Sequence, residues 1–148
     1  MNLASPTAHR GASAYARVGI ETSTQCASPH QLIAMLFEGA ATAIAMARHH
    51  MAERRISAKG ESISKAIDII ENGLKASLDP AAGGAAGERL VNDLSALYDY
   101  IVRKLMHANL RNDAAALDES ASLLESVGSA WREIDPAASP LSSLPMAA

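Results

Sequence analysis

The chain has 148 residues and a formal net charge of −3 at pH 7, so we expect one domain and no strongly basic surface for nucleic acid. About half of the residues are apolar, 49%, but only 3% are aromatic, and many of the apolar residues are alanines. Because alanine, leucine and methionine favour helix and β-branched or aromatic runs are scarce, the composition predicts an all-α protein.

The N-terminal part of the chain lacks helical periodicity. Residues 1–14 are small, polar and proline-containing, and we expect them to be disordered. Residues 15–27 contain Tyr15, Val18 and Ile20 as apolar anchors. These anchors predict an N-terminal arm that docks on the helical domain.

Neither secretion nor membrane insertion is expected. Residues 1–19 contain no apolar core of a signal peptide. The most apolar stretch, residues 32–47, is shorter than a membrane span and carries Glu38 in its middle, so it predicts a core helix. Cys26 is the single cysteine, which excludes an intramolecular disulfide and fits a reducing compartment.

A capping box predicts the start of the first helix. Ser28 suits the N-cap, Pro29 the first helical position, and Gln31 the third. An apolar stripe then continues, and we expect the helix to end near Arg54. Gly39 lies inside it at a cost of about 1 kcal/mol relative to alanine, which a close helix–helix contact would explain.

The second helix is predicted from Ser57, a possible N-cap, to Leu78, where Asp79 and Pro80 stop it. Its apolar positions recur at steps of three and four residues. They form a main seam and a second row: Ile63, Ile67, Ile70, Leu74 and Leu78, then Ala66, Ile69 and Gly73.

Two further helices follow the glycine-rich turn at residues 81–88. The third is predicted from Gly87 to Leu110, and the fourth from an N-cap at Asp113 to near Ile134. The seam of the third helix consists of Leu90, Leu94, Leu97, Tyr98, Ile101, Leu105 and Ala108. The seam of the fourth consists of Leu117, Ala121, Leu124, Val127 and Trp131, with Trp131 interpreted as a core anchor rather than a binding residue.

Four amphipathic helices with short links predict an antiparallel four-helix bundle with an N-terminal extension. The domain would span residues 15–134, followed by a disordered tail at residues 135–148. The apolar faces are wider than the stripe of about 100° that a bundle core requires. The extra apolar width is surface that could meet a partner.

Two tyrosines in the third helix receive different interpretations. At about 100° per residue, Tyr98 falls within the seam, whereas Tyr100 lies about 200° away from it, beside charged residues. We therefore expect Tyr98 in the core. Tyr100 is either a partner contact or a partly exposed side chain that covers a neighbouring helix or the arm.

No pattern in the chain predicts catalysis, a metal or a cofactor. No glutamate is followed by histidine three residues later, which is the pattern of di-iron bundles. His49 and His50 are adjacent and would point about 100° apart on a helix. Cys26 and His30 lack a third orienting group, so the cysteine is interpreted as a small apolar residue.

The chain resembles the FliS family of flagellar secretion chaperones from about Tyr15 to Ile134. Four motifs in order carry the resemblance: "ASPHQLIAMLFEGA" at 27–40, "KAIDII" at 65–70 with "SLD" at 77–79, "LYDYIVRKLMHANL" at 97–110, and "AW" at 130–131. The resemblance implies a four-helix bundle without catalysis or cofactor. It also implies a cytoplasmic chaperone that binds the disordered C-terminal region of flagellin, prevents early polymerisation, and helps deliver flagellin to the type III export apparatus, whose gate includes the protein FlhA.

Helix-in-groove recognition would let the bundle bind such a client. The candidate flagellin-binding residues are Tyr15, Val18, Ile20, Ile69, Tyr100, Arg103, Lys104 and His107. The arm is a possible cover of the client groove, and Ile69 fits a groove wall and a wide core equally well. A generic helical adaptor and a metal or cofactor enzyme remain the alternative hypotheses, and monomer or homodimer is left open.

Overall fold

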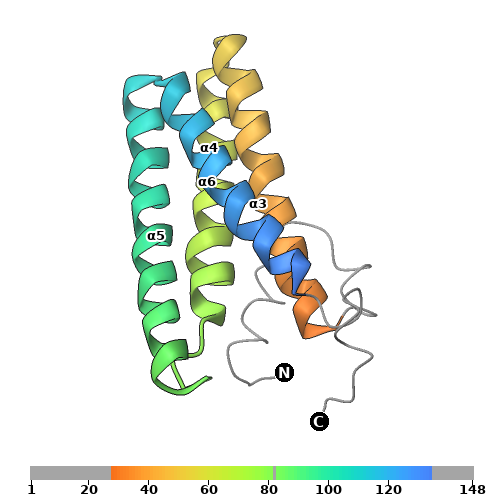
Figure 1. Ribbon diagram of the computed structural model, residues 1–148. Helices are drawn as coiled ribbons and strands as arrows, with labels where there is room; N and C mark the ends of the chain where they lie inside the picture. The colour runs from red at the N-terminus through yellow and green to blue at the C-terminus, as the bar shows by residue number, and fades with distance from the viewer. Residues whose placement is uncertain (1–27, 82, 135–148) are drawn as a thin grey trace, which may run out of the picture.

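The computed structural model describes residues 28–81 and 83–134, and this part of the chain is helical with no β-strand (Figure 1). Helix α3 spans Pro29–Ala52 and begins at the predicted capping box. The Ser28 hydroxyl accepts a hydrogen bond from the Gln31 amide at 3.1 Å, and the Gln31 side chain accepts one from the Ser28 amide at 2.8 Å. Two backbone donors that would otherwise lack partners are thereby satisfied.

The second helical segment is less regular than predicted. Helix α4 spans Ile56–Ile69, continues as a π-helical turn, η1, at Ile70–Leu74, and ends as a 3-10 turn, η2, at Lys75–Ser77. The prediction of Ser57 as N-cap is wrong. Arg55 occupies the cap without a side-chain hydrogen bond, because the short link from α3 turns directly into the helix.

The π-helical turn has a packing consequence. An α-helix places adjacent residues about 100° apart, so two adjacent pairs rarely face one core. The wider turn brings both Ile69 with Ile70 and Gly73 with Leu74 into the interior, where all four are buried. The two predicted rows of apolar residues therefore share the core, whereas Ile67 of the main seam stays partly exposed.

Helix α5 spans Gly84–Arg111 and helix α6 spans Ala114–Glu133. Helix α5 begins three residues before the predicted start at Gly87. Its first residue and the preceding glycine both have positive φ angles, which glycine adopts without steric cost. The predicted N-cap of α6 is confirmed, because Asp113 accepts a hydrogen bond from the amide of Ala116 at 3.3 Å.

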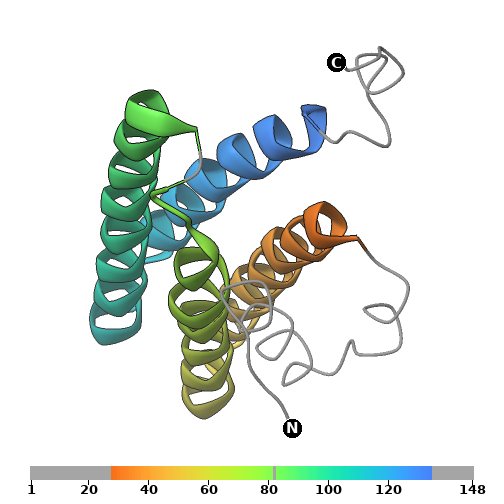
Figure 2. The same cartoon turned by 90° about the horizontal axis from the view of Figure 1, so that it is seen from below.

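The helices form an all-α bundle in which successive helices run in opposite directions (Figure 1). Helix α3 packs against α4 and α6, and α5 packs against α6 and α4. Helix α6 does not run alongside α5 for its whole length. It starts at the end of α5 and crosses obliquely towards the N-terminal end of α3 (Figures 1 and 2). The predicted fold class is confirmed.

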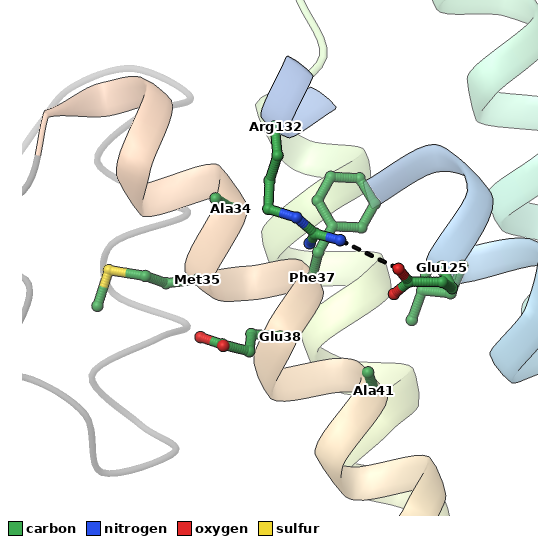
Figure 3. Close-up of a pocket in the computed structure, with 8 residues that line it drawn as sticks. Ala34, Met35, Phe37, Glu38, Ala41, Glu125 and Arg132 are labelled. Atoms are coloured by element: carbon green, nitrogen blue, oxygen red, sulfur yellow. Dashed lines mark hydrogen bonds and ion pairs between the residues drawn. The ribbon is translucent and has the colours of Figure 1, made fainter. Parts of the chain in front are cut away.

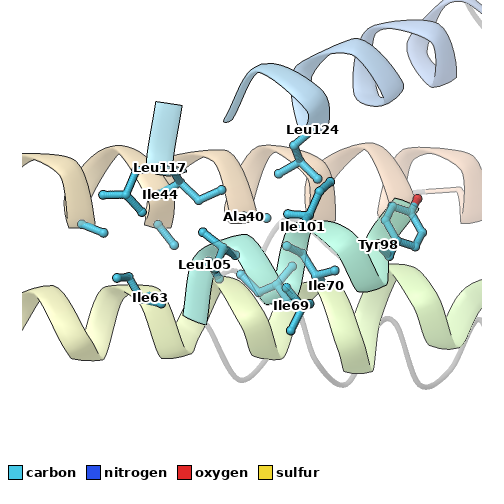
Figure 4. Close-up of a cluster of buried hydrophobic side chains, with 14 of the residues drawn as sticks. Ala40, Ile44, Ile63, Ile69, Ile70, Tyr98, Ile101, Leu105, Leu117 and Leu124 are labelled. Carbon is cyan, nitrogen blue, oxygen red and sulfur yellow. The ribbon is translucent and has the colours of Figure 1, made fainter. Parts of the chain in front are cut away.

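The core lies between the four helices and consists mainly of leucine and isoleucine (Figure 4). Its largest fully buried apolar side chains are Leu36, Ile44, Ile63, Ile69, Ile70, Leu74, Ile101, Leu105, Leu117 and Leu124. Tyr98 joins them with only 3% of its surface exposed, as predicted. Burial raises the pKa of the Tyr98 hydroxyl, because the charged phenolate would lose its hydration.

Glycine permits the closest helix contacts at Gly73 and Gly128. A Cβ atom on Gly73 would lie 3.1 Å from Leu36, and one on Gly128 would lie 3.2 Å from Phe37. The close contact expected at Gly39 is an ordinary one, since a Cβ there would lie 3.5 Å from Ile69. The tight approach to α3 therefore comes from η1 and α6.

Helix α3 also passes the length and hydropathy test for a membrane span. Six of its residues are buried against the neighbouring helices: Leu36, Phe37, Ala40, Ala43, Ile44 and Ala47. This burial matches the predicted core helix. The predictions for residues 1–14, the arm at 15–27 and the tail at 135–148 lie outside the described residues.

Candidate functional site

The N-terminal half of α5 carries an apolar face that the bundle leaves partly uncovered. All buried residues of α5 lie from Tyr98 onward. Before that point, Leu90 is 59% exposed, and Val91, Leu94 and Leu97 are only partly buried. We call these four residues the α5 apolar face. Leu90, Leu94 and Leu97 were expected in the core seam, and for Leu90 that expectation is wrong.

The course of α6 explains why this face is uncovered. Helix α5 has 28 residues and α6 has 20, so α6 cannot cover its neighbour from end to end. In Figures 1 and 2, α6 moves away from α5 towards α3 as it proceeds. Along its second half, Val127 remains only partly buried, and Ile134, directly after the helix, is 62% exposed. The N-terminal half of α5 and the second half of α6 therefore each keep apolar side chains that are partly exposed.

A contact between the two ends of the described chain fixes the far end of α6. The Trp131 indole N–H donates a hydrogen bond to the backbone carbonyl of His30 at 3.0 Å. The two rings stack with centroids 4.4 Å apart and planes 10° from parallel. Trp131 is therefore a partly buried anchor of α6 on the start of α3, in agreement with its interpretation as a structural residue.

A pocket of about 280 Å³ lies between α3 and α6, next to this anchor (Figure 3). Phe37, Leu124 and two alanines give it apolar walls. Glu38, Glu125 and Arg132 add charges, and Arg132 donates a hydrogen bond to Glu125 at 3.1 Å. An apolar interior with a charged rim suits a side chain of an amphipathic helix.

The predicted polar candidates gather where α5 meets the start of α6. The Tyr100 hydroxyl donates a hydrogen bond to Glu119 at 2.6 Å, and the Lys104 ammonium pairs with the same carboxylate at 3.1 Å. His107 lies 3.2 Å from Asp113. Arg103 lies over the Tyr100 ring, 6.0 Å from its centroid. The cluster holds α5 against α6.

The hydrogen bonds of this cluster shift the pKa values of its members. The bonds from Tyr100 and then Lys104 lower the pKa of the Glu119 carboxyl, because they favour the carboxylate. The bond to Glu119 raises the pKa of Lys104, and the same carboxylate raises the pKa of Tyr100. Each shift favours the paired form of the cluster near neutral pH.

The predicted candidate residues fall in three groups: a cluster on α5, one residue in the core, and the anchors of the arm. Tyr100, Arg103, Lys104 and His107 form one cluster on α5. Ile69 is fully buried in the core, so it does not line a surface groove in this structure.

The anchors of the arm, Tyr15, Val18 and Ile20, lie outside the described residues. The α5 apolar face and the α3–α6 pocket were not predicted. The third and fourth helices were predicted with nearly equal lengths, so no clear signal in the sequence indicated the uncovered face.

No metal-ligand cluster is found in residues 28–81 and 83–134, where three or more histidine, cysteine or acidic side chains never converge. At the α3–α6 pocket, for example, the Glu125 carboxylate accepts a hydrogen bond from Arg132.

Comparison with known proteins agrees with these features. The family model described as "Flagellar protein FliS" matches residues 11–138. The flagellar secretion chaperone FliS of Salmonella typhimurium is 50% identical over 87% of this chain and 93% of its own length. The Escherichia coli protein of the same name is 44% identical over 85% and 90%, and the flagellar secretion chaperone FliSB of Pseudomonas aeruginosa is 41% identical over 79% and 89%. Since the match spans nearly all of the helical domain, the chain belongs to the FliS family of flagellar proteins.

Proposed function

We propose that this protein is a cytoplasmic flagellar secretion chaperone without catalytic activity. Its client is flagellin, whose disordered C-terminal segment it binds until export. Binding prevents premature polymerisation, and the loaded chaperone then meets the export gate protein FlhA. Family membership and the names of the relatives support the chaperone role.

The observation that carries the client assignment is the uncovered α5 apolar face. A disordered segment loses conformational entropy when it binds, so it needs a large apolar contact to offset that loss. Leu90, Val91, Leu94 and Leu97 supply apolar side chains on successive turns of one helix. A client segment that folds into an amphipathic helix would lie along them, in place of the neighbour that α6 does not provide.

Two other surfaces extend the proposed client site. The α3–α6 pocket would take an apolar side chain from a second part of the client. On α5, Tyr100, Arg103, Lys104 and His107 would contribute contacts at the flank, where Arg103 has no ion-pair partner in the described chain. The anchors Tyr15, Val18 and Ile20 would cover the α5 apolar face when no client is bound, whereas Ile69 would remain in the core.

The proposal is tested by co-purification of the full chain with full-length flagellin and with flagellin that lacks its C-terminal segment. We expect the chaperone to retain the first and not the second. In titrations, Leu90→Gln should weaken flagellin binding about tenfold, which corresponds to the loss of one apolar anchor worth about 1.4 kcal/mol. Because Leu90 is 59% exposed, folding should be unaffected.

Met46→Gln is the matched control, since Met46 is 48% exposed on α3, away from α5. It should bind flagellin as the parent protein does. Equal retention of both flagellin forms would contradict a C-terminal client segment and would favour a general adaptor role. Equal affinity of Leu90→Gln and the parent would remove the α5 apolar face from the client site.

A further inference from the structure

The bundle end opposite the start of α5 carries exposed apolar and cationic side chains that the client assignment does not use. The turn from α3 to α4 and the turn from α5 to α6 both lie at this end (Figure 1). The buried Lys59 ammonium joins them, because it donates to the Asn109 carbonyl at 3.0 Å and to the side chain of Asn112. We call Arg54, Ile56, Met106, Leu110 and Arg111 the arginine end.

The apolar members of the arginine end are unusually exposed. Leu110 is 80% exposed, and Ile56 and Met106 are each 57% exposed. Met106 and Leu110 are four residues apart and lie on one face of α5. Ile56 lies one helical turn from Gly60, where a Cβ atom would come within 3.8 Å of Asn109. The three side chains therefore belong to neighbouring helix ends.

The charges of this end leave a cationic surplus. Arg54 and Arg111 form no ion pair within the described chain, whereas Asp113 and Glu119 are held by hydrogen bonds and ion pairs. Glu61 is the one carboxylate near this end for which the described residues provide no partner. A surface of this kind attracts acidic groups.

The backbone of Arg54 gives an independent observation. The Arg54 amide donates to the Met51 carbonyl at 3.1 Å and the Arg55 amide donates to the His50 carbonyl at 2.9 Å, a pattern that ends α3 as a Schellman motif. The left-handed residue of this motif is usually glycine, yet Arg54 occupies it with φ of 61°. A strained arginine whose side chain makes no ion pair in the described chain indicates a requirement outside the bundle.

We propose that the arginine end docks an acidic protein segment that also carries apolar side chains, and that this partner is distinct from the client. Arg54 and Arg111 pair with its carboxylates, and Ile56, Met106 and Leu110 contact its apolar residues. The charge surplus favours this partner over a second copy of the chain, which would bring like charges together in a symmetric contact.

The test uses two synthetic amphipathic helical peptides with identical leucine positions, one with glutamate and one with lysine at every polar position. Binding to the full-length protein is measured by fluorescence anisotropy. We expect the glutamate peptide to bind at least tenfold more tightly than the lysine peptide, with an affinity that falls as salt rises. Equal binding of both peptides, or binding of neither, would overturn the proposal.

Variants locate the contact on the molecule. Arg54→Gly should raise Tm, because glycine adopts the left-handed conformation without strain. The same substitution should weaken binding of the glutamate peptide severalfold. An Arg54→Gly protein with higher Tm and unchanged affinity would mean that the arginine has no partner. Leu110→Gln with Arg111→Gln should weaken binding at least tenfold, and the control pair Arg89→Gln with Leu90→Gln at the other end of α5 should not.

Flagellin binding and self-association separate this proposal from the client assignment. The Leu110→Gln, Arg111→Gln protein should bind flagellin as the parent protein does, whereas Leu90→Gln should bind flagellin about tenfold more weakly and keep its affinity for the glutamate peptide. If the Leu110→Gln, Arg111→Gln protein bound flagellin more weakly than the parent protein, the arginine end would belong to the client site and the proposal of a second partner would be wrong. A parent dimer that the same substitutions dissociate in sedimentation would show a second copy as the occupant.

Discussion

Lys59 is a buried cation that caps the C-terminal end of helix α5. Only 3% of its surface is exposed, and its ammonium donates to the Asn109 carbonyl at 3.0 Å and to Asn112. No carboxylate pairs with it in the described chain. The carbonyl groups at the C-terminal end of α5 take that role, since a helix C-terminus carries partial negative charge. The apolar periodicity of α4 did not predict this contact of Lys59.

Lys59→Met should destabilise the fold by about 2–3 kcal/mol, because the charged hydrogen bonds of Lys59 are lost and the partly buried Asn109 carbonyl on α5 is left without this donor. The methionine stem fills similar space, so the change in packing is small. The free energy of unfolding in urea measures the effect. Lys65→Met, at an exposed position of the same helix, is the control and should change stability by less than about 0.5 kcal/mol. A similar loss in both proteins would refute the capping role of Lys59.

The Glu119 carboxylate makes part of the stability depend on pH. Its pKa in the folded protein is lowered from the ordinary 4.5, first by the Tyr100 hydroxyl and then by Lys104. This stabilisation is therefore fully present above pH 4.5 and is lost as the pH falls through the lower folded-state pKa. The Lys104 pKa is raised above 10.5, so its share persists below that pH and disappears as the pH rises through the folded-state pKa.

Glu119→Gln should lower Tm near neutral pH, and the difference from the parent protein should shrink as the pH falls below about 4.5. Thermal unfolding at a series of pH values measures this dependence. Glu133→Gln, at an exposed position of the same helix, controls for removal of one negative charge. A difference that stays constant down to pH 3 would mean that the carboxylate contributes no pH-dependent stability.

At the level of the helices, the approach of α6 to α3 depends on a missing side chain. Gly128 is buried, and a Cβ atom there would lie 3.2–3.3 Å from three atoms of the buried Phe37, two in its ring and its Cβ. An alanine would gain about 1 kcal/mol of helix propensity but force a ring in a packed core to move. Phe37 is 4% exposed and packs in the core with Leu124, so a shift of its ring, which can only be towards the α3–α6 pocket that both side chains line, disturbs that packing.

Gly128→Ala should therefore destabilise the bundle by about 1–3 kcal/mol, measured as the free energy of unfolding. Gly60→Ala is the matched control. The nearest atom to its Cβ would be the Asn109 side chain at 3.8 Å, an ordinary contact. It should stabilise by up to about 1 kcal/mol through helix propensity. The same sign for both substitutions would show that the approach to Phe37 is not tight.

At the level of the whole molecule, the sequence predicted the order of the helices in the described residues and two of the three proposed N-caps, whereas Ser57 was wrong. Ser28 and Asp113 were found because a cap needs only nearby residues, and the apolar periods that predict a bundle are equally local. The π-helical turn at Ile70–Leu74 was missed, since it arises from packing against α3 and α5. Local propensity carries no information about such a choice.

The candidate site was harder to predict than the fold for the same reason. Leu90 and Leu105 occupy equivalent seam positions, yet Leu90 is 59% exposed and Leu105 fully buried. The difference depends on the oblique path of α6, which no local pattern records. Tyr100 was placed correctly away from the seam, but its hydrogen bond to Glu119 required the tertiary structure. Periodicity identifies which face of a helix is apolar and cannot identify what covers it.

Because Trp131 stacks on His30, the fluorescence of Trp131 can report on this contact without a label. Trp131 is the single tryptophan of the chain, so tryptophan emission comes from one place, the junction of the first and last described helices. A histidine ring stacked on an indole quenches its emission, and this effect weakens as the two rings separate. Emission intensity therefore follows the separation of these two helix ends in unlabelled protein, and a stopped-flow trace can test whether they move when flagellin is added.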